Sequence, residues 1–508
     1  MKEQSKNAPI SKKKQAAGHI AIYSVGSIAR QLVGFIMLPI YTRLLSPADY
    51  GIVALLSVLI SIFELAIGAR FVRAIPRFFY ETTDDTERSS TISTALIITS
   101  TTSLVGVILL ATNGAVASTL LFGVPDYAIY VATYSVLLLT TAVENYGLTY
   151  IRLLERPLLF ITVSIGKLIL QLSLNILLVV FLRLGVAGVI ISAIVSSAIF
   201  CLLMAFFIII RTGLRFDTTL AKRLIRFTWP LWLAGGASLY IGASSRFFIR
   251  IFSDLSDVGL FELAARFASL VGFLVWGPFS QWWQTERFAL YQRDDHGQPV
   301  FRAIFNLITC VTLLACVGIS LFADSIIKIM ADANFHTASL AVPPLAFAAV
   351  VRHAALFYNF SFLAKDKVGF IASIKYFEAI AMTILMLLLI PKYGFLGAAY
   401  ALFAANTLVF LVTYYYAQRT YDSGARFGTF AKMFVAGILI VGIDTLQKPE
   451  SEYLVSLAMK CLLTFVYIGI LATVIHLDKS TRFLTKTVLS TIQKGSQEFL
   501  ARLRRKDS

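Results

Sequence analysis

The sequence predicts an all-α, polytopic membrane protein of about fourteen transmembrane helices, arranged as two parallel six-helix lobes followed by two C-terminal helices. Three observations lead to this fold class. The 508-residue chain is 58% apolar and only 14% charged. Long apolar runs recur along its whole length, and a short motif from the first half returns in the second. Soluble proteins are closer to a quarter charged, so the composition alone indicates a membrane protein.

The predicted spans follow from the thickness of the bilayer, because a crossing helix needs roughly 20 mainly apolar residues. Fourteen runs meet this requirement: 20–41, 50–70, 91–111, 127–147, 159–182, 185–210, 227–250, 258–283, 301–322, 336–358, 369–390, 394–418, 430–446 and 453–476. Spans one to six and seven to twelve form the two lobes. Each lobe holds an even number of crossings, so both enter the membrane from the same side, which predicts parallel repeats.

An internal repeat supports the two lobes. Arg183–Gly188 reappears 209 residues later as Lys392–Gly397, each time between two long apolar runs. At the same spacing Arg156 matches Lys365. Duplicated units of this kind are usual in secondary transporters, where the substrate path lies between the halves.

The repeat also sets the predicted domain boundaries. The motif at Arg43–Gly51 recurs at Arg250–Gly259, with one additional residue between the arginine and the glycine. The second copy therefore includes the seventh span. The predicted parts are a basic tail at 1–19, an N-terminal lobe at 20–210, a linker at 211–226, a C-terminal lobe at 227–418, two additional spans at 430–476 and a basic amphipathic tail at 477–508.

The net charge of +17 is distributed as in a membrane protein. The predicted spans place both tails and every second connecting loop on one side of the membrane. About 32 of the 45 Lys and Arg lie in these segments, and about five lie in the loops of the opposite side. This asymmetry follows the positive-inside rule, so we expect both termini in the cytoplasm. Basic residues beside a membrane are explained by insertion and anionic lipid, and we therefore predict no nucleic-acid partner.

The sequence offers no motif for catalysis, a metal or a nucleotide. The cysteines, Cys201, Cys310, Cys316 and Cys461, lie inside apolar runs without metal-binding spacing, and the five histidines form no cluster. There is no Walker loop or Gly-rich nucleotide fingerprint. We therefore predict a protein that is not an enzyme, that holds no cofactor or metal and that is not driven directly by ATP.

The informative residues are charges inside the spans, since a charge at mid-depth costs a few kcal/mol unless it meets a partner or water. The basic residues are Arg30, Lys167, Arg246, Arg266 and Lys375. They outnumber the acidic residues of the repeated spans, which favours a cavity that accepts an anion. Arg suits phosphate because its planar fork donates two hydrogen bonds while staying charged.

A structural interpretation of the same charges stands beside the functional one. Glu262 with Arg266, and Lys375 with Glu378, are close enough along a helix to neutralise each other. Arg30 and Arg246 have no partner within their own helices, which favours a place in the cavity. Lys167 and Lys375 occupy nearly equivalent places in the two repeats.

The N-terminal region resembles a known family. The stretch GSIARQLVGFIMLPIYTRLLSPADYG at residues 26–51 is similar to the opening of bacterial polysaccharide-biosynthesis flippases, and the resemblance continues through residues 68–80 and the two glycine motifs. These flippases belong to the multidrug/oligosaccharidyl-lipid/polysaccharide exporter superfamily. The resemblance implies a MATE-like fold of two six-helix lobes plus two helices, in agreement with the span count.

The resemblance implies a function as well: export of an undecaprenyl-diphosphate-linked oligosaccharide across the bacterial inner membrane, for O-antigen, capsule or exopolysaccharide. Polysaccharide polymerase and export machinery are the implied partners. By charge and predicted depth we assign Arg30, Arg246 and Arg266 to the diphosphate, with Lys167 and Lys375 as further candidates. The resemblance also implies transport driven by an ion gradient, of protons or sodium, and Glu64 and Glu262 are the candidates for ion coupling.

Other functions remain open at this point. A multidrug or organic-cation antiporter of the same superfamily needs carboxylates to dominate its cavity, and here cations are in excess. A flippase for a peptidoglycan precursor has the same charge requirements. A membrane polymerase or ligase usually places its catalytic residues in a large outer loop, and the connections here are short.

Overall fold

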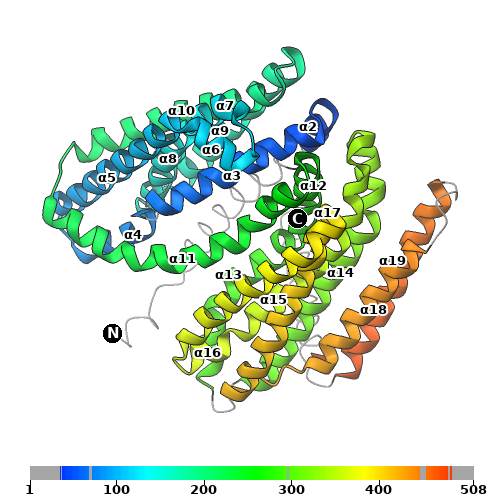
Figure 1. Cartoon of the computed structure of the whole chain (residues 1–508). Helices are drawn as coiled ribbons and strands as arrows, with labels where there is room; N and C mark the ends of the chain where they lie inside the picture. The colour runs from blue at the N-terminus through cyan, green and yellow to red at the C-terminus, as the bar shows by residue number, and fades with distance from the viewer. Residues whose placement is uncertain are drawn as a thin grey trace, which may run out of the picture. The chain divides into compact units, whose positions relative to one another are not determined.

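The computed structural model describes residues 35, 37–67, 71–293, 297–446, 453–478 and 481–482, and the elements in these ranges are all helical (Figure 1). Eleven of the helices are long and apolar enough to cross a membrane. One of them, α17, contains the eleventh and twelfth predicted spans. The seventh predicted span lies within α11, which is not one of these eleven helices. The first predicted span lies largely outside the described residues. The predicted all-α membrane architecture is confirmed for the rest.

The chain divides into two compact units, residues 1–262 with 330–335 and residues 263–329 with 336–508. The elements of unit 1 are α2 (Leu38–Leu44), α3 (Pro47–Ile67), α4 (Phe71–Glu81), α5 (Asp85–Thr112), α6 (Gly114–Phe122), the 3₁₀ turn η1 (Pro125–Tyr127), α7 (Ala128–Tyr134), α8 (Val136–Leu153), α9 (Pro157–Asn175), the π-helical turn η2 (Ile176–Phe181), α10 (Gly185–Thr212), α11 (Thr218–Phe252) and the first turns of α12 (Leu255–Val271).

Unit 2 contains the remainder of α12, the π-helical segment η3 (Gly272–Trp276), α13 (Gly277–Tyr291), α14 (Gln298–Met330), the 3₁₀ segment η4 (Ala333–Ala341), α15 (Val342–Tyr358), α16 (Phe360–Ala364), α17 (Val368–Thr420), α18 (Phe427–Thr445) and α19 (Tyr453–Leu477). The first three residues of η4 belong to unit 1 by their packing. The two additional helices, α18 and α19, pack against each other.

The segment predicted as a linker, 211–226, is mostly helical. After α10 ends at Thr212, α11 begins at Thr218, where the Asp217 carboxylate accepts hydrogen bonds from the backbone amides of Thr219 and Leu220. This is a standard N-cap, which satisfies amides that have no partner inside the helix. Because α11 packs on α3, α4 and α5, the compact units divide at Glu262, later in the chain than the predicted boundary between the repeats.

The repeated glycine motif forms the same turn twice. Gly185 and Gly394 both have φ of +55°, a left-handed conformation that favours glycine. The second glycine of each motif packs on the preceding helix: a Cβ on Gly188 would lie 3.1 Å from the Leu178 carbonyl oxygen, and one on Gly397 only 2.3 Å from that of Leu389. The motif therefore marks a tight helix–helix turn in each unit.

The structure corrects the register of the repeat before this turn. Glu155 and Asp366 both have φ of +54° at the preceding turn, so these two residues correspond, at a spacing of 211 rather than 209. Thirty residues separate Glu155 from Gly185, and 28 separate Asp366 from Gly394. The π-helical turn η2 lies in the longer copy, and such a turn accommodates added residues within a helix. The sequence match of Arg156 with Lys365 was therefore wrong by two residues.

The interior of unit 1 is apolar where α4, α5, α8, α10 and α11 meet. Phe78, Ile92, Tyr146, Ile208 and Leu224 belong to one buried cluster. The Tyr146 hydroxyl is fully buried and donates to the Ile92 carbonyl oxygen at 2.5 Å, which removes the cost of burying it.

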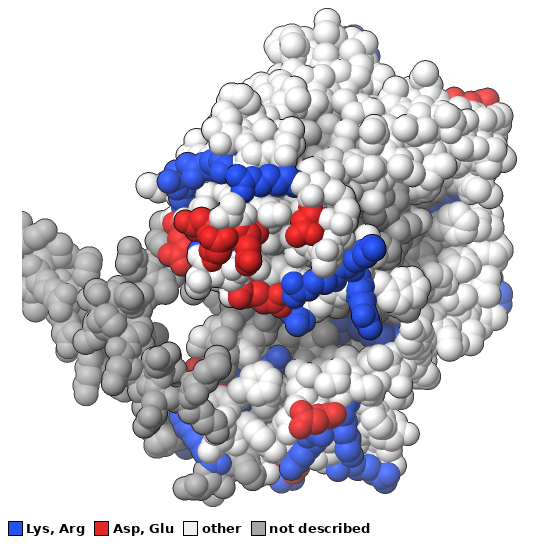
Figure 2. Space-filling view, turned by 90° about the vertical axis from the view of Figure 1, so that its left-hand side faces the viewer, with Lys and Arg blue, Asp and Glu red and all other residues white. Residues whose placement is uncertain are grey.

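The outer surface is suited to lipid in large part. Leu202, Phe206 and Ile210 recur every four residues along α10 and are 66–69% exposed. Figure 2 shows charged side chains of both signs gathered in one part of the face in view, with wide uncharged areas beyond it. At the ends of α4 and α11, Glu81 accepts from both Arg77 and Arg223. Charge is thus concentrated at helix ends, as expected where chains leave the bilayer.

Candidate functional site

The predicted site residue Arg246, on α11, is held by a carboxylate of the neighbouring helix. Its Nε and Nη2 atoms donate to Glu262 Oε2 on α12 at 2.8 and 2.7 Å, and Nη1 donates to the Gly242 carbonyl oxygen at 2.8 Å. The side chains are 21% and 14% exposed. Glu262 therefore takes a cation from another helix, a partner that its sequence spacing to Arg266 did not predict. An incoming phosphate has to compete with Glu262 for this guanidinium.

Lys167 on α9 contacts two side chains from other helices of unit 1. Its ammonium pairs with Glu144 on α8 and lies 3.3 Å from the Ser197 hydroxyl on α10. Ser197 in turn donates to Glu144 Oε2 at 3.2 Å. The three side chains form a polar cluster inside the spans that joins α8, α9 and α10. Sequence reasoning selected Lys167 and missed its partners, because residues 23 and 30 positions away share no helical face with it.

Glu64, a predicted coupling residue on α3, has a different environment. Its Oε1 atom accepts a hydrogen bond of 3.3 Å from the Thr141 hydroxyl on α8. Within the described residues no Lys or Arg contacts this carboxylate. A carboxylate with only a neutral donor can exchange a proton without breaking an ion pair, which is compatible with the predicted coupling role.

In unit 2 the predicted site residue Lys375 is paired within its own helix. Lys375 Nζ lies 2.5 Å from Glu378 Oε2 on α17, and the lysine is 26% and the glutamate 4% exposed. This is the intrahelical pair that the sequence spacing predicted. Arg266 is half-buried on α12. Arg30 lies outside the described residues.

The corrected register places opposite charges at one repeat position. Lys167 follows Glu155 by twelve residues, and Glu378 follows Asp366 by twelve. The first repeat therefore has a lysine where the second has a glutamate, and each forms an ion pair there. The predicted equivalence of Lys167 with Lys375 is close, one helical turn apart, but the exact counterpart of Lys167 is acidic.

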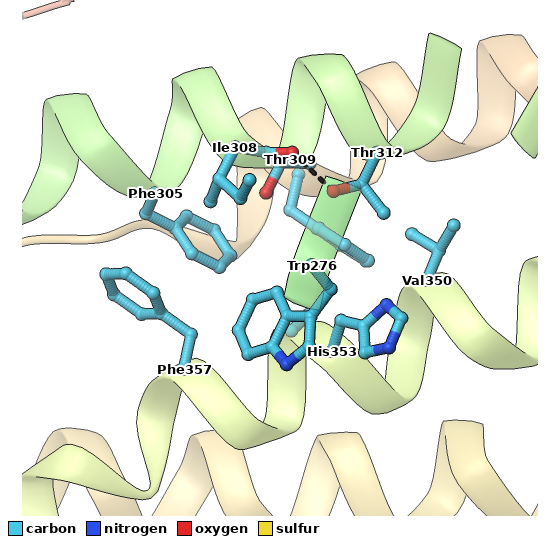
Figure 3. Close-up of a pocket in the computed structure, with 10 residues that line it drawn as sticks. Trp276, Phe305, Ile308, Thr309, Thr312, Val350, His353 and Phe357 are labelled. Carbon is cyan, nitrogen blue, oxygen red and sulfur yellow. Dashed lines mark hydrogen bonds between the residues drawn. The ribbon is translucent and has the colours of Figure 1, made fainter. Parts of the chain in front are cut away.

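Unit 2 also contains a small pocket that sequence reasoning did not identify (Figure 3). Its walls come from η3, α14, α15 and α18. The lining side chains are aromatic or aliphatic except for His353 and two threonines: Trp276, Phe305, Ile308, Thr309, Thr312, Val350, His353, Ala354, Phe357 and Phe430. A lone histidine among apolar residues gives no signal in a sequence.

These sites bring cations and carboxylates together inside the membrane. Arg246, Lys167 and Lys375 each contact a carboxylate, and each retains donors that a phosphate oxygen can use. Among the described residues, no group of three or more His, Cys, Asp or Glu side chains is placed to hold a metal ion.

Comparison with known proteins points to one family and one fold. Residues 40–340 match the family model described as "Polysaccharide biosynthesis protein". No curated protein matches the chain. The fold is similar to that of the lipid II flippase MurJ in an inward closed conformation, with a TM-score of 0.69 at 14% identity over 89% of this chain and 98% of the other.

Two transporters share the fold as well. An inward-facing multidrug resistance MATE family transporter of the MOP superfamily gives a TM-score of 0.63 at 16% identity, over 77% of this chain and 94% of the other. The MATE multidrug transporter DinF-BH gives 0.57 at 17% identity, over 84% and 99%. The chain is therefore a multi-pass membrane protein with the fold of these flippases and transporters.

Proposed function

Because the chain belongs to the polysaccharide biosynthesis protein family, we propose that it is a flippase for an undecaprenyl-diphosphate-linked oligosaccharide. It moves this lipid from the cytoplasmic to the outer leaflet of the bacterial inner membrane by alternating access, with both termini in the cytoplasm. The glycan is a repeat unit for O-antigen, capsule or exopolysaccharide. A polysaccharide polymerase and export machinery then act on the product.

The proposal depends on the basic side chains on the long helices of this chain, taken together with its membership of a polysaccharide biosynthesis family. Lys167 and Lys375 lie in candidate spans, Arg246 lies on α11, and the three side chains are 20–26% exposed. A diphosphate that displaces a carboxylate keeps the cation paired, since one anionic oxygen replaces another. The ion pairs thus keep the cations charged and desolvated in the absence of cargo, ready for an anionic headgroup.

The carboxylates argue against an organic-cation antiporter, the alternative suggested by the MATE-like fold. Glu144, Glu262 and Glu378 each contact a Lys or Arg of the chain itself. A cationic drug needs a carboxylate whose charge is not already neutralised. Glu64 is left for ion coupling, with protons or sodium as the driving ion.

The proposal is tested by deleting the gene and measuring lipid-linked glycans of the inner membrane by mass spectrometry. The deletion strain is complemented with wild type, Arg246→Ala or Lys432→Ala. Lys432 is an exposed lysine on α18 and serves as the matched control, since it removes a cation without touching the predicted site.

A complete undecaprenyl-diphosphate glycan that accumulates in the deletion strain and is cleared by wild type and Lys432→Ala, but not by Arg246→Ala, supports the flippase and the Arg246 role. Clearance by all three proteins removes Arg246 from the site. Accumulation of a peptidoglycan precursor instead, recognised by its mass, reassigns the cargo. No accumulation together with greater sensitivity to cationic drugs favours the antiporter.

A further inference from the structure

The pocket of unit 2 contains one titratable side chain, and its surroundings are unusual for a histidine. His353 stacks on Trp276, with ring centroids 4.9 Å apart and an interplanar angle of 7°. Its Nδ1 atom is buried and has no hydrogen-bond partner among the described residues. Buried polar nitrogens are nearly always paired, and an unpaired one in a native protein calls for an explanation.

The charges around His353 are few. Apart from His353, no residue that lines the pocket is charged or titratable, and Arg352, the neighbour of His353 on α15, is exposed and is not part of the lining. No carboxylate of the described chain pairs with the imidazole. A protonated His353 therefore has only the face of Trp276 and the hydroxyls of Thr309 and Thr312 to stabilise its charge (Figure 3).

The stacking partner of His353 belongs to a distorted part of the helix. Trp276 ends the π-helical segment η3, Gly272–Trp276, between α12 and α13. The imidazole occupies the space that a side chain at Gly272 would need, since a Cβ there would lie 3.1 Å from Cε1 and 3.2 Å from Nε2. Both ends of the π-helical segment thus contact His353. Such segments are frequent at functional sites because their helical hydrogen bonds shift with little cost.

From this geometry we propose that His353 is a proton-binding site of unit 2, and that its protonation changes the conformation of η3. A proton taken from water forms the imidazolium at Nδ1. The closed pocket solvates this charge poorly, so protonation favours a conformation in which the stack on Trp276 opens and water reaches the ring. One part of the inference, that this proton is the ion coupled to flipping, rests on the proposed transport function.

The proposal is tested first without any substrate. Opening of the stack exposes the Trp276 indole to water and lowers its fluorescence, so full-length protein in lipid nanodiscs is titrated from about pH 8 to about pH 5, the range in which a hydrated imidazole gains its proton. We expect a fall in tryptophan fluorescence in wild type. His353→Gln and Trp276→Phe each lose most of this fall, and His476→Gln, a control at an exposed histidine, retains it.

A fall of wild-type size in His353→Gln overturns the proposal. Trp276→Phe keeps the histidine and guards against misfolding of the first variant, and both are compared with wild type by thermal unfolding. If both variants unfold at a clearly lower temperature than wild type, the test moves to NMR of the wild-type protein, labelled with ¹⁵N at its five histidines. The pH dependence of the His353 signal then decides whether the side chain binds a proton. A signal that does not respond to pH over this range excludes proton binding.

The link to transport is tested in proteoliposomes that contain a fluorescent undecaprenyl-diphosphate disaccharide. Wild type and His476→Gln are expected to move this lipid faster across an imposed pH gradient than without one, and His353→Gln is expected to lose the acceleration. If wild type moves no lipid at all, the proposed function fails while the fluorescence titration still decides the proton site. If His353→Gln keeps the acceleration, the proton that drives transport binds elsewhere.

Discussion

The ion pairs Lys167–Glu144 and Lys375–Glu378 share one position of the two repeats, yet they are built differently. In unit 1 the pair joins α9 to α8, and Ser197 adds α10. In unit 2 both partners lie on α17, one helical turn apart. The first pair holds helices together, whereas the second leaves its lysine attached to a single helix. A duplicated architecture can thus keep an ion pair at one repeat position and change what that pair connects.

The largest effect is expected from removing the interhelical carboxylate. Glu144→Gln leaves Lys167 without a counter-ion in a site where Glu144 is 7% exposed, and we expect the free energy of unfolding to fall by about 3 kcal/mol. Glu378→Gln should lower it by only about 1 kcal/mol, because Lys375 is more exposed and no helix contact is lost.

Thermal unfolding in detergent, followed by tryptophan fluorescence, measures both variants. The double variant Glu144→Leu with Lys167→Met is the control, since replacing both charges restores much of the stability when the loss comes from an orphaned cation. Equal losses in the two single variants would mean that the orphaned lysine, and not the contact between helices, sets the cost.

The two glycine turns provide a second contrast between the repeats. Gly397→Ala forces a Cβ against the Leu389 carbonyl oxygen, 2.3 Å away, and we expect a loss of about 2 kcal/mol. Gly188→Ala meets the Leu178 carbonyl oxygen at 3.1 Å and should cost about 1 kcal/mol or less. The same unfolding assay measures the pair, and the reverse order would show that the first turn is the tighter one.

The pairs also allow the predicted roles of the two lysines to be compared. Lys375→Met with Glu378→Leu, and Lys167→Met with Glu144→Leu, remove each charge without leaving its partner alone. We expect flipping of the fluorescent lipid to slow about tenfold in the first double variant, which corresponds to about 1.4 kcal/mol of lost stabilisation. A smaller loss is expected in the second, whose lysine is tied to three helices. Unchanged rates in both would remove these lysines from the diphosphate site.

The smallest effect concerns a carboxylate just beyond the last span. At the end of α19, Asp478 pairs with Arg302 on α14 and accepts hydrogen bonds from Asn306 and Thr481. Burial raises the pKa of Asp478, but the bonds from Thr481 and the charge of Arg302 outweigh it, so the pKa lies below its usual value.

A carboxyl whose pKa is lowered in the folded state stabilises the protein above the unfolded pKa, and this contribution disappears as the pH falls through the folded value. We therefore expect the anchor of α19 to weaken only below about pH 4, near the usual pKa of aspartate. Thermal unfolding at a series of pH values measures the effect. Asp478→Asn should remove this acid dependence, and a loss of stability that begins near neutral pH would assign it to another group.

The sequence by itself determined the membrane class, the spans and the repeated turn. Composition and run length decide whether a segment is stable in a bilayer, and this depends on neighbouring residues alone. The turn at Gly185 and Gly394 was likewise predictable. A glycine between two apolar runs favours a turn, because glycine adopts a left-handed backbone without strain. The intrahelical partner of Lys375 followed from the three-residue spacing to Glu378.

Only the tertiary structure decided which charges meet between helices. Glu262 lies 16 residues after Arg246 and Glu144 lies 23 before Lys167, and no periodicity relates residues on separate helices. The correct register of the repeat also required the backbone conformation. The first copy is two residues longer and contains the π-helical turn η2, and an ungapped sequence comparison cannot detect such an insertion. Contacts between helices depend on packing and rotation of whole elements, and it is this packing that gives Arg246, Lys167 and His353 their distinct environments.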